Sequence, residues 1–216
     1  MHRVTPLPSY LVKRLERWRA TNYAENRSWF SHLAEHGQHP RTMFISCCDS
    51  RVDPVSMFEG EPGDFFIVRN VANIVPPHAP DHEHHGTSAA IEFAVTGLGV
   101  SHIVVMGHSG CGGVAACDAL CSRTDGKPGK TEGFIDNWIR ILAPAWKNVD
   151  ATADDATRLR RLEQEGVKVS LANLLTFPFV ASAVQEGRLA LHGLWTDVGS
   201  GSVHVYQPGT DDYAEL

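Results

Sequence analysis

The sequence predicts an α/β fold: a mainly parallel central sheet with an antiparallel edge hairpin, flanked by helices and preceded by an N-terminal helical arm. Short apolar runs alternate with longer segments of helical periodicity, which is typical of parallel strands joined by crossover helices. The last two apolar runs are separated only by the four residues 199–202, among them Gly199, Ser200 and Gly201, which indicates a hairpin. With 216 residues, 43% of them hydrophobic, the chain is expected to form one domain, 1–216, in which residues 1–38 are the arm.

The arm is predicted to contain two short helices. The first begins after Pro8, where Leu11, Leu15 and Trp18 recur at helical spacing with charged residues between them. The second lies around Trp29 and ends before a turn that contains a glycine and a proline. Exposed bulky apolar residues suit an arm that packs on a partner subunit, and they equally suit packing on the chain's own domain.

The core elements follow in order along the chain. Strands are predicted at the apolar runs 43–45, 65–68, 103–106, 189–198 and 203–206. Helices are predicted where apolar residues recur at helical spacing and where Gly or Pro marks an end of the segment. The predicted helices are 87–98, one that begins at about 113, 133–147, 154–175 and 181–186.

Two of these helices are expected to pack on the core through one α-helical face. In helix 87–98 that face consists of Ala90, Phe93, Ala94, Gly97 and Leu98. In helix 154–175 it consists of Leu159, Leu162, Leu171, Leu174 and Leu175.

Loops are predicted where Gly, Pro and charged residues gather, at 59–64, 76–86 and 122–130. The second of these loops contains His78, His82, His84 and His85. Histidine-rich tracts can bind metal. A Pro-rich loop imposes no fixed geometry, so we expect a solvated turn here.

Composition and charge exclude several classes of protein. The formal net charge is −6 and no basic cluster is present, which argues against a nucleic-acid partner. No apolar run approaches the roughly 20 residues that a membrane span requires, and residues 1–8 lack the apolar core of a signal peptide. We therefore expect a cytoplasmic protein with a small-molecule partner and no membrane partner.

Chemically active side chains follow three of the predicted strands. The segment 47–51, with two cysteines, an aspartate and an arginine, follows the first strand, Arg69 follows the second, and His108 follows the third. Ligands of open parallel sheets collect beyond the carboxyl ends of the strands. The sequence therefore predicts that these residues meet in one crevice.

Cys47, His108 and Cys111 form a candidate metal-binding set. Two thiolates and one imidazole favour zinc and leave one tetrahedral position for water or a carboxylate, which is typical of a catalytic site. A structural zinc site usually has four protein ligands, often from paired Cys-x-x-Cys knuckles, and no second knuckle accompanies His108-x-x-Cys111. Cys117 and Cys121, at helical spacing without a nearby histidine, are attributed to packing.

Asp49 and Arg51 lie next to this set along the chain. Asp49 is close enough to Cys47 to reach the open coordination position, and Arg51 can hold its carboxylate through a bidentate ion pair. The alternative is a salt bridge that stabilises a turn, worth about 0–1 kcal/mol if exposed.

The chain resembles the β-class carbonic anhydrases from about Pro40 to Val198, through three ordered motifs: Cys47-x-Asp49-Ser50-Arg51, Arg69-Asn70-x-Ala72-Asn73 and His108-Ser109-x-Cys111-Gly112-Gly113. The resemblance implies a carbonate dehydratase, which reversibly hydrates CO2 to bicarbonate and a proton by metal-bound hydroxide. It also implies a homodimer or a dimer of dimers, with the arm wrapped over the partner.

The resemblance also assigns roles to individual residues. Cys47, His108 and Cys111 would bind one Zn²⁺ per subunit. Asp49 and Arg51 would form a catalytic dyad that accepts a hydrogen bond from zinc-bound hydroxide. Arg69 and Val71 are expected to line the substrate pocket.

Three positions depart from the family pattern. Phe44 and Thr196 stand where one branch of the family has the Trp and Tyr of a regulatory bicarbonate pocket, so the resemblance does not imply that pocket here. Cys48 replaces a small residue, and it is either packed or prone to oxidation.

Two other functions remain compatible with these residues. The same zinc site could hydrolyse CS2 or COS, since the ligands would be identical. A non-catalytic zinc or redox-sensing protein could use Cys47, Cys48 and Cys111, although adjacent cysteines lack the spacing of a dithiol exchange motif.

Overall fold

The structure is a computed structural model that describes residues 4–81, 84–124 and 133–216. The chain divides into two compact units, Met1–His39 and Pro40–Leu216. This boundary falls next to the predicted end of the arm at residue 38. The single-domain organisation and the packing of the arm on a partner subunit stay predictions.

The arm consists of helices α1 (Ser9–Trp18) and α2 (Arg27–His36), joined through a π-helical turn, η1 (Arg19–Tyr23). The rings of Trp18, Tyr23 and Phe30 contact one another, with centroid distances of 5.2 to 5.8 Å. Neither α1 nor α2 buries any of its residues. Two helices are present as predicted, and their apolar side chains are exposed or only partly buried.

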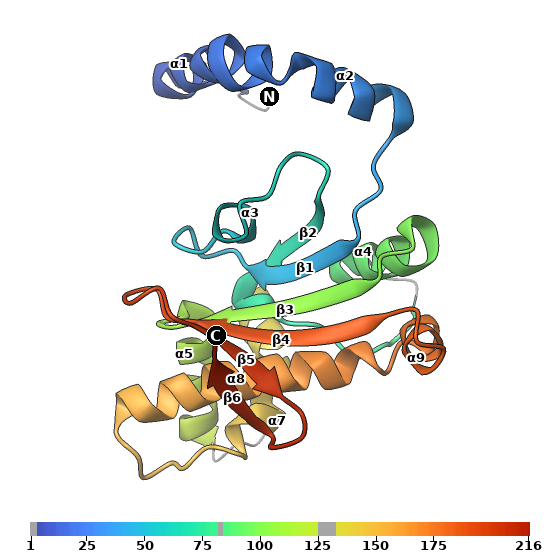
Figure 1. Cartoon of the computed structure of the whole chain (residues 1–216). Helices are drawn as coiled ribbons and strands as arrows, with labels where there is room; N and C mark the ends of the chain where they lie inside the picture. Colours follow the sequence, from blue (N-terminus) through green and yellow to red (C-terminus); the bar gives the residue numbers. More distant parts are fainter. Residues whose placement is uncertain (1–3, 82–83, 125–132) are drawn as a thin grey trace. The chain divides into compact units, whose positions relative to one another are not determined.

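The second unit is built on a sheet with the strand order β2-β1-β3-β4-β5-β6 (Figure 1). The strands are β1 (Thr42–Cys47), β2 (Phe65–Asn70), β3 (His102–His108), β4 (Ala190–Thr196), β5 (Val203–Gln207) and β6 (Asp212–Glu215). Strands β2, β1, β3 and β4 pair in parallel, whereas β5 and β6 pair antiparallel. The predicted α/β fold is confirmed.

Strand β6 was not predicted from the sequence. Only Tyr213 of its four residues is even partly buried. A strand this short and exposed has no apolar alternation, so the sequence pattern could not reveal it.

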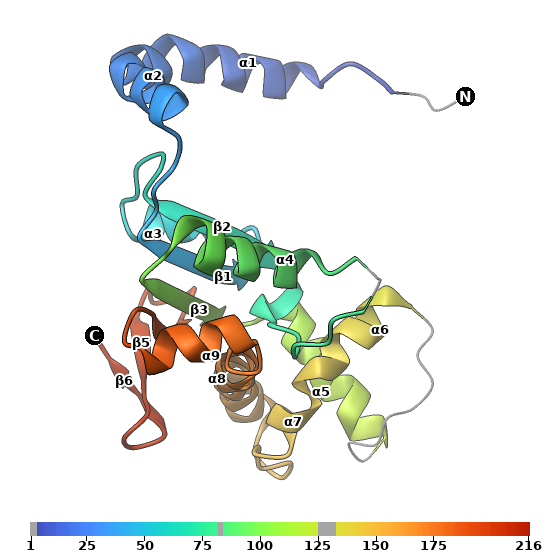
Figure 2. The same ribbon diagram turned by 90° about the vertical axis from the view of Figure 1, so that its right-hand side faces the viewer.

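Helices lie around the sheet. The helical segments of this unit are α3 (Pro54–Met57), η2 (Val71–Asn73), α4 (Gly86–Glu92), η3 (Phe93–Leu98), α5 (Gly112–Thr124), α6 (Phe134–Ile139), η4 (Arg140–Leu142), α7 (Ala143–Trp146), α8 (Asp155–Leu174) and α9 (Pro178–Gln185). Helices α4, α8 and α9 lie on the same side of the sheet (Figure 2). Met43 and Ile45 of β1 pack in one buried cluster with residues of these helices. Phe44, between them, faces the other side of the sheet and a separate cluster with Val52.

Taken one at a time, none of the helices within residues 4–81, 84–124 and 133–216 combines the length and the apolar character of a bilayer span. Helices α8 and α9, bent by 90° at the break between them, have that length and composition only as a pair.

The predicted face of helix 87–98 is partly wrong. Ile91, Ala94 and Val95 are buried, whereas Phe93 is 50% exposed. The helix changes at Phe93 from α4 to the π-helical turn η3. Ile91, Ala94, Val95 and the partly buried Leu98 recur at the α-helical offsets 0, 3, 4 and 7, so the buried face contains Ile91 and Val95 rather than Phe93.

Several helices begin or end at other residues than the sequence predicts. Helix α9 begins at Pro178 rather than at residue 181, because proline is tolerated in a first helical turn. The predicted helix 133–147 is divided into α6, η4 and α7. Helix α5 extends to Thr124, past the predicted start of the loop 122–130, and residues 125–130 of that loop lie outside the described residues.

The predicted core of α8 is confirmed at Leu162 and Leu174 and wrong at Leu175, which is 48% exposed just beyond the end of the helix. The helix also buries four polar residues that no apolar pattern predicts: Glu163, Gln164, Glu165 and Ser170. Buried carboxylates require hydrogen-bond or ionic partners.

Candidate metal centre

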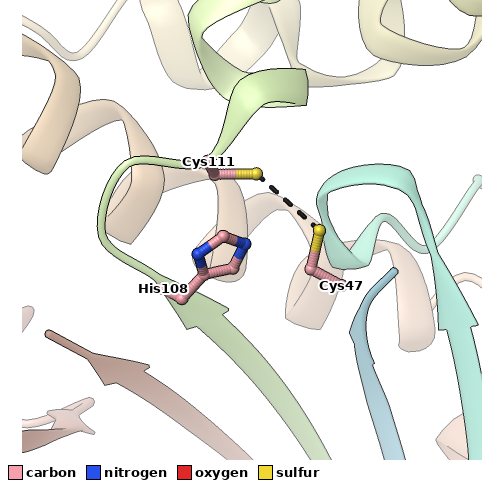
Figure 3. A group of neighbouring side chains, drawn as sticks. All are labelled: Cys47, His108 and Cys111. Carbon is pink, nitrogen blue, oxygen red and sulfur yellow. Dashed lines mark hydrogen bonds between the residues drawn. The ribbon is translucent and has the colours of Figure 1, made fainter. Parts of the chain in front are cut away.

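Three buried side chains converge at the carboxyl ends of neighbouring parallel strands. Cys47 is the last residue of β1, His108 is the last residue of β3, and Cys111 directly precedes α5. One potential ligand atom from each lies within 4.8 Å of the others, and the two sulfur atoms are 3.9 Å apart. Figure 3 shows the side chains pointing toward one another. The structure therefore brings together the three residues that the sequence proposed as ligands.

The His108 ring has one nitrogen available for a metal. Its Nδ1 lies 3.0 Å from the carbonyl oxygen of Ser109, which can only accept, so Nδ1 carries the proton. In the part of the chain that the structure describes, the buried Nε2 has no hydrogen-bond partner. A histidine oriented through Nδ1–H with a buried, unpartnered Nε2 is the usual form of a metal-binding imidazole.

The two thiols are electrostatically coupled. The Cys111 thiol donates to Cys47 Sγ, and this hydrogen bond lowers the pKa of Cys47. The same bond, together with burial, raises the pKa of Cys111. The backbone N–H groups of Asp49 and Ala72 also donate to Cys47 Sγ, each at 3.4 Å. One thiolate is thus stabilised already, and the donor set of two sulfurs and one imidazole fits zinc.

A strained turn supplies one of these donors. Ala72 has φ 62° and Asn73 has φ 46°, in the left-handed region that side chains rarely adopt. The Asn70 side chain brackets the turn: the Ile74 N–H donates to Oδ1, and Nδ2 donates to the Ile74 carbonyl, both at 2.8 Å. Asn70 therefore holds the Ala72 amide toward Cys47, a role that the sequence motif did not reveal.

Asp49 and Arg51 form a bidentate pair. Arg51 Nε donates to Asp49 Oδ1 at 2.9 Å, and Nη2 donates to Oδ2 at 2.7 Å. Nη2 also donates to the Gly110 carbonyl at 3.0 Å, which links this loop to the loop between His108 and Cys111. The Arg51 guanidinium holds the pKa of the Asp49 carboxyl well below its usual range. The Asp49 side chain is 17% exposed and that of Arg51 is 52% exposed, so the pair is partly open to solvent.

Arg69 and Val71 lie beside the centre. Arg69 donates to three backbone carbonyls: from Nε to Cys47 at 2.9 Å, and from Nη2 to Asp49 at 2.7 Å and Val52 at 2.6 Å. Val71 packs against the buried cluster that includes Cys47 and Cys111. Arg69 thus braces the loop that carries Cys47, and its place in a substrate pocket stays a prediction, as does that of Val71.

Among the described residues of 40–216, no other cysteine or histidine belongs to the Cys47, His108 and Cys111 cluster. Cys117 and Cys121 are buried in α5, and their sulfur atoms lie 3.9 Å apart. Cys48 is exposed. In the histidine-rich loop His84 and His85 are exposed, and His82 lies outside the described residues.

Phe44 and Thr196, which stand where one branch of the family has the Trp and Tyr of the regulatory pocket, make other contacts here. The Phe44 ring packs against Phe58 and Phe65, with both centroid distances 5.0 Å. The Thr196 hydroxyl donates to the Ser202 carbonyl at 3.2 Å.

Comparison with known proteins agrees with this geometry. Residues 42–203 match the family model described as carbonic anhydrase. The chain is 38% identical to Beta carbonic anhydrase 3 of Arabidopsis thaliana over 193 residues, which cover 88% of this chain and 73% of that protein. It is 40% identical to a carbonic anhydrase of Pseudomonas aeruginosa over 202 residues, which cover 93% of this chain and 88% of that protein.

Solved structures are similar over nearly the whole chain. The β-carbonic anhydrase CcaA has a TM-score of 0.84 at 29% identity, covering 96% of this chain and 91% of that one. A structure reported with two tetrameric β-carbonic anhydrases from Sordaria macrospora has a TM-score of 0.77 at 33% identity, covering 91% of this chain and 95% of that one.

Proposed function

The chain belongs to the β-class carbonic anhydrases, and from that premise we propose that it is a zinc-dependent carbonate dehydratase, which interconverts CO2 and water with bicarbonate and a proton. One observation carries this proposal: ligand atoms of Cys47, His108 and Cys111 lie within 4.8 Å of one another in a buried cluster.

The chain's own residues would bind one zinc ion per subunit. Cys47 and Cys111 would bind through Sγ and His108 through Nε2, so that two thiolates balance the charge of the ion and one tetrahedral position remains for solvent. A bound zinc ion acts as a Lewis acid and lowers the pKa of a water molecule that it binds from 15.7 to about 7.

Asp49 is the group proposed to orient the reacting water. Its low pKa keeps the carboxylate ionised, so it can accept a hydrogen bond but not donate one. Both carboxylate oxygens are held by Arg51, which keeps Asp49 from moving to bind the metal itself. CO2 is uncharged, so the substrate needs only an apolar surface beside the centre, and Val71 is proposed to provide part of it. The released proton passes to solvent.

Removal of the metal tests the proposal. In stopped-flow assays, the rate of CO2 hydration should rise in proportion to measured zinc content, fall to the buffer rate after chelation, and recover when zinc is added back. Fully zinc-loaded protein that hydrates CO2 no faster than buffer would refute the proposed activity and favour the non-catalytic alternative. Turnover of CS2 or COS in preference to CO2 would favour the hydrolase alternative, which uses the same ligands.

The assembly and cellular location are also proposals. We propose a homodimer or a dimer of dimers, in which the arm packs on a partner. The tetrameric Sordaria macrospora enzymes support this proposal, as do the exposed apolar residues Leu11, Leu15 and Trp18 of α1. A monomer in light scattering would contradict it. The proposed location is the cytoplasm, which fluorescence microscopy of the tagged protein can test.

A further inference from the structure

Helix α8 brings a buried acid to the metal-binding loop. The helix packs closely on the end of β3: a Cβ placed on Gly107 would lie 2.8 Å from Val167 Cγ2 and 3.6 Å from the Glu163 carbonyl oxygen. Gly107 directly precedes His108, so this contact fixes α8 against the strand that delivers the imidazole. Glu163 is 4% exposed at this point.

Both oxygens of Glu163 are engaged by neutral donors. The backbone N–H of Cys111 donates to Oε1, and Trp195 Nε1–H donates to Oε2, each at 3.0 Å. Trp195 is 1% exposed and lies on β4, paired with Gly107. The carboxylate therefore connects the backbone of a candidate metal ligand to the neighbouring strand.

The surroundings of Glu163 differ from those of Glu165, the next buried acid on the same helix. Glu165 forms ion pairs with Arg161 at 3.0 Å and Lys168 at 2.9 Å. Glu163 has no ion pair with a cationic side chain of residues 4–81, 84–124 and 133–216. A carboxylate buried without a cation is costly, and an apolar residue would fill the same space more cheaply. Packing alone does not account for an acid at this position.

We propose, on the premise that the chain is a zinc enzyme, that Glu163 is a positioning residue for the metal centre. By holding the Cys111 amide, Glu163 fixes the backbone from which Cys111 Sγ extends toward Cys47 and His108. Groups that orient metal ligands in this way typically change metal affinity by about 10–100-fold when removed.

The test compares Glu163→Gln with Glu165→Gln. Glutamine keeps the shape of the side chain but places an NH2 group against one of the two N–H donors. We expect the Glu163→Gln protein to release zinc to a chelator at least about 10-fold faster than wild type, and the cobalt(II)-substituted protein to show shifted absorption bands. Glu165→Gln, which weakens two ion pairs on the same helix, should match wild type in both measurements.

Trp195→Phe provides a second variant. It removes the donor to Oε2 but leaves the Cys111 N–H in place, so zinc release should be faster than in wild type and slower than in Glu163→Gln. Because Trp195 acts through Glu163, the double variant should release zinc at the rate of Glu163→Gln alone.

Two results would overturn the inference in distinguishable ways. If wild type holds zinc and hydrates CO2, but Glu163→Gln releases zinc at the wild-type rate with an unshifted cobalt spectrum, Glu163 is not a positioning residue. A wild-type protein that binds neither zinc nor cobalt would overturn the proposed function, and this inference with it.

Discussion

Arg51→Ala should retain its zinc and lose CO2 hydration by roughly 100-fold, the upper end of the loss expected when a metal-site residue loses its orienting partner. Arg51 binds both oxygens of Asp49 and the Gly110 carbonyl, but it is not one of the three candidate ligands. Without it, Asp49 is free to rotate away from the reacting water or to bind the metal.

The measurement is stopped-flow CO2 hydration on Arg51→Ala protein with its zinc content determined on the same sample. Arg188→Ala is a matched control. Arg188 also pairs with an acid two residues earlier, Glu186, at 2.6 Å, but that pair is exposed and lies outside the centre. The control should keep wild-type activity. Full activity in Arg51→Ala would show that Asp49 does not need this partner.

Cys111→Ser should lose stoichiometric zinc and, with it, CO2 hydration. Cys111 is 2% exposed and supplies one of the two sulfur atoms of the centre. Serine nearly preserves the volume but replaces a soft thiolate, which zinc binds well, with a hydroxyl that is a poor zinc ligand at neutral pH. The remaining Cys47 and His108 are too few to hold the ion.

Zinc content after dialysis and the rate of CO2 hydration together test this prediction. Cys117→Ser is the control, because Cys117 is equally buried on the helix that follows Cys111 but does not belong to the ligand cluster. It should lose some stability and keep its zinc. Retention of one zinc per chain by Cys111→Ser would remove Cys111 from the proposed ligand set.

Features encoded locally were predictable from the sequence. The apolar runs that become β1 and β3 end at Cys47 and His108. The carboxyl ends of parallel strands meet at one edge, so the rule that predicts the sheet also predicts that these ligands meet. The Asp49–Arg51 pair was predictable for a similar reason, since its two members are close in sequence.

Features that depend on distant contacts were not predictable. Glu163 contacts Cys111 across 52 residues of sequence, and its position in a helix does not distinguish it from a solvated acid. The π-helical turn η3 has no distinct apolar period. The left-handed Ala72 lies in a turn that the Asn70 side chain brackets through two hydrogen bonds, which no local pattern reveals.

X-ray absorption at the zinc edge of the wild-type protein tests the proposed centre most directly. One zinc per chain with two sulfur neighbours at about 2.3 Å, and nitrogen or oxygen neighbours at about 2.0 Å completing four, is the expected result. A zinc ion with no sulfur neighbours, or with four, would contradict the centre built from Cys47, His108 and Cys111.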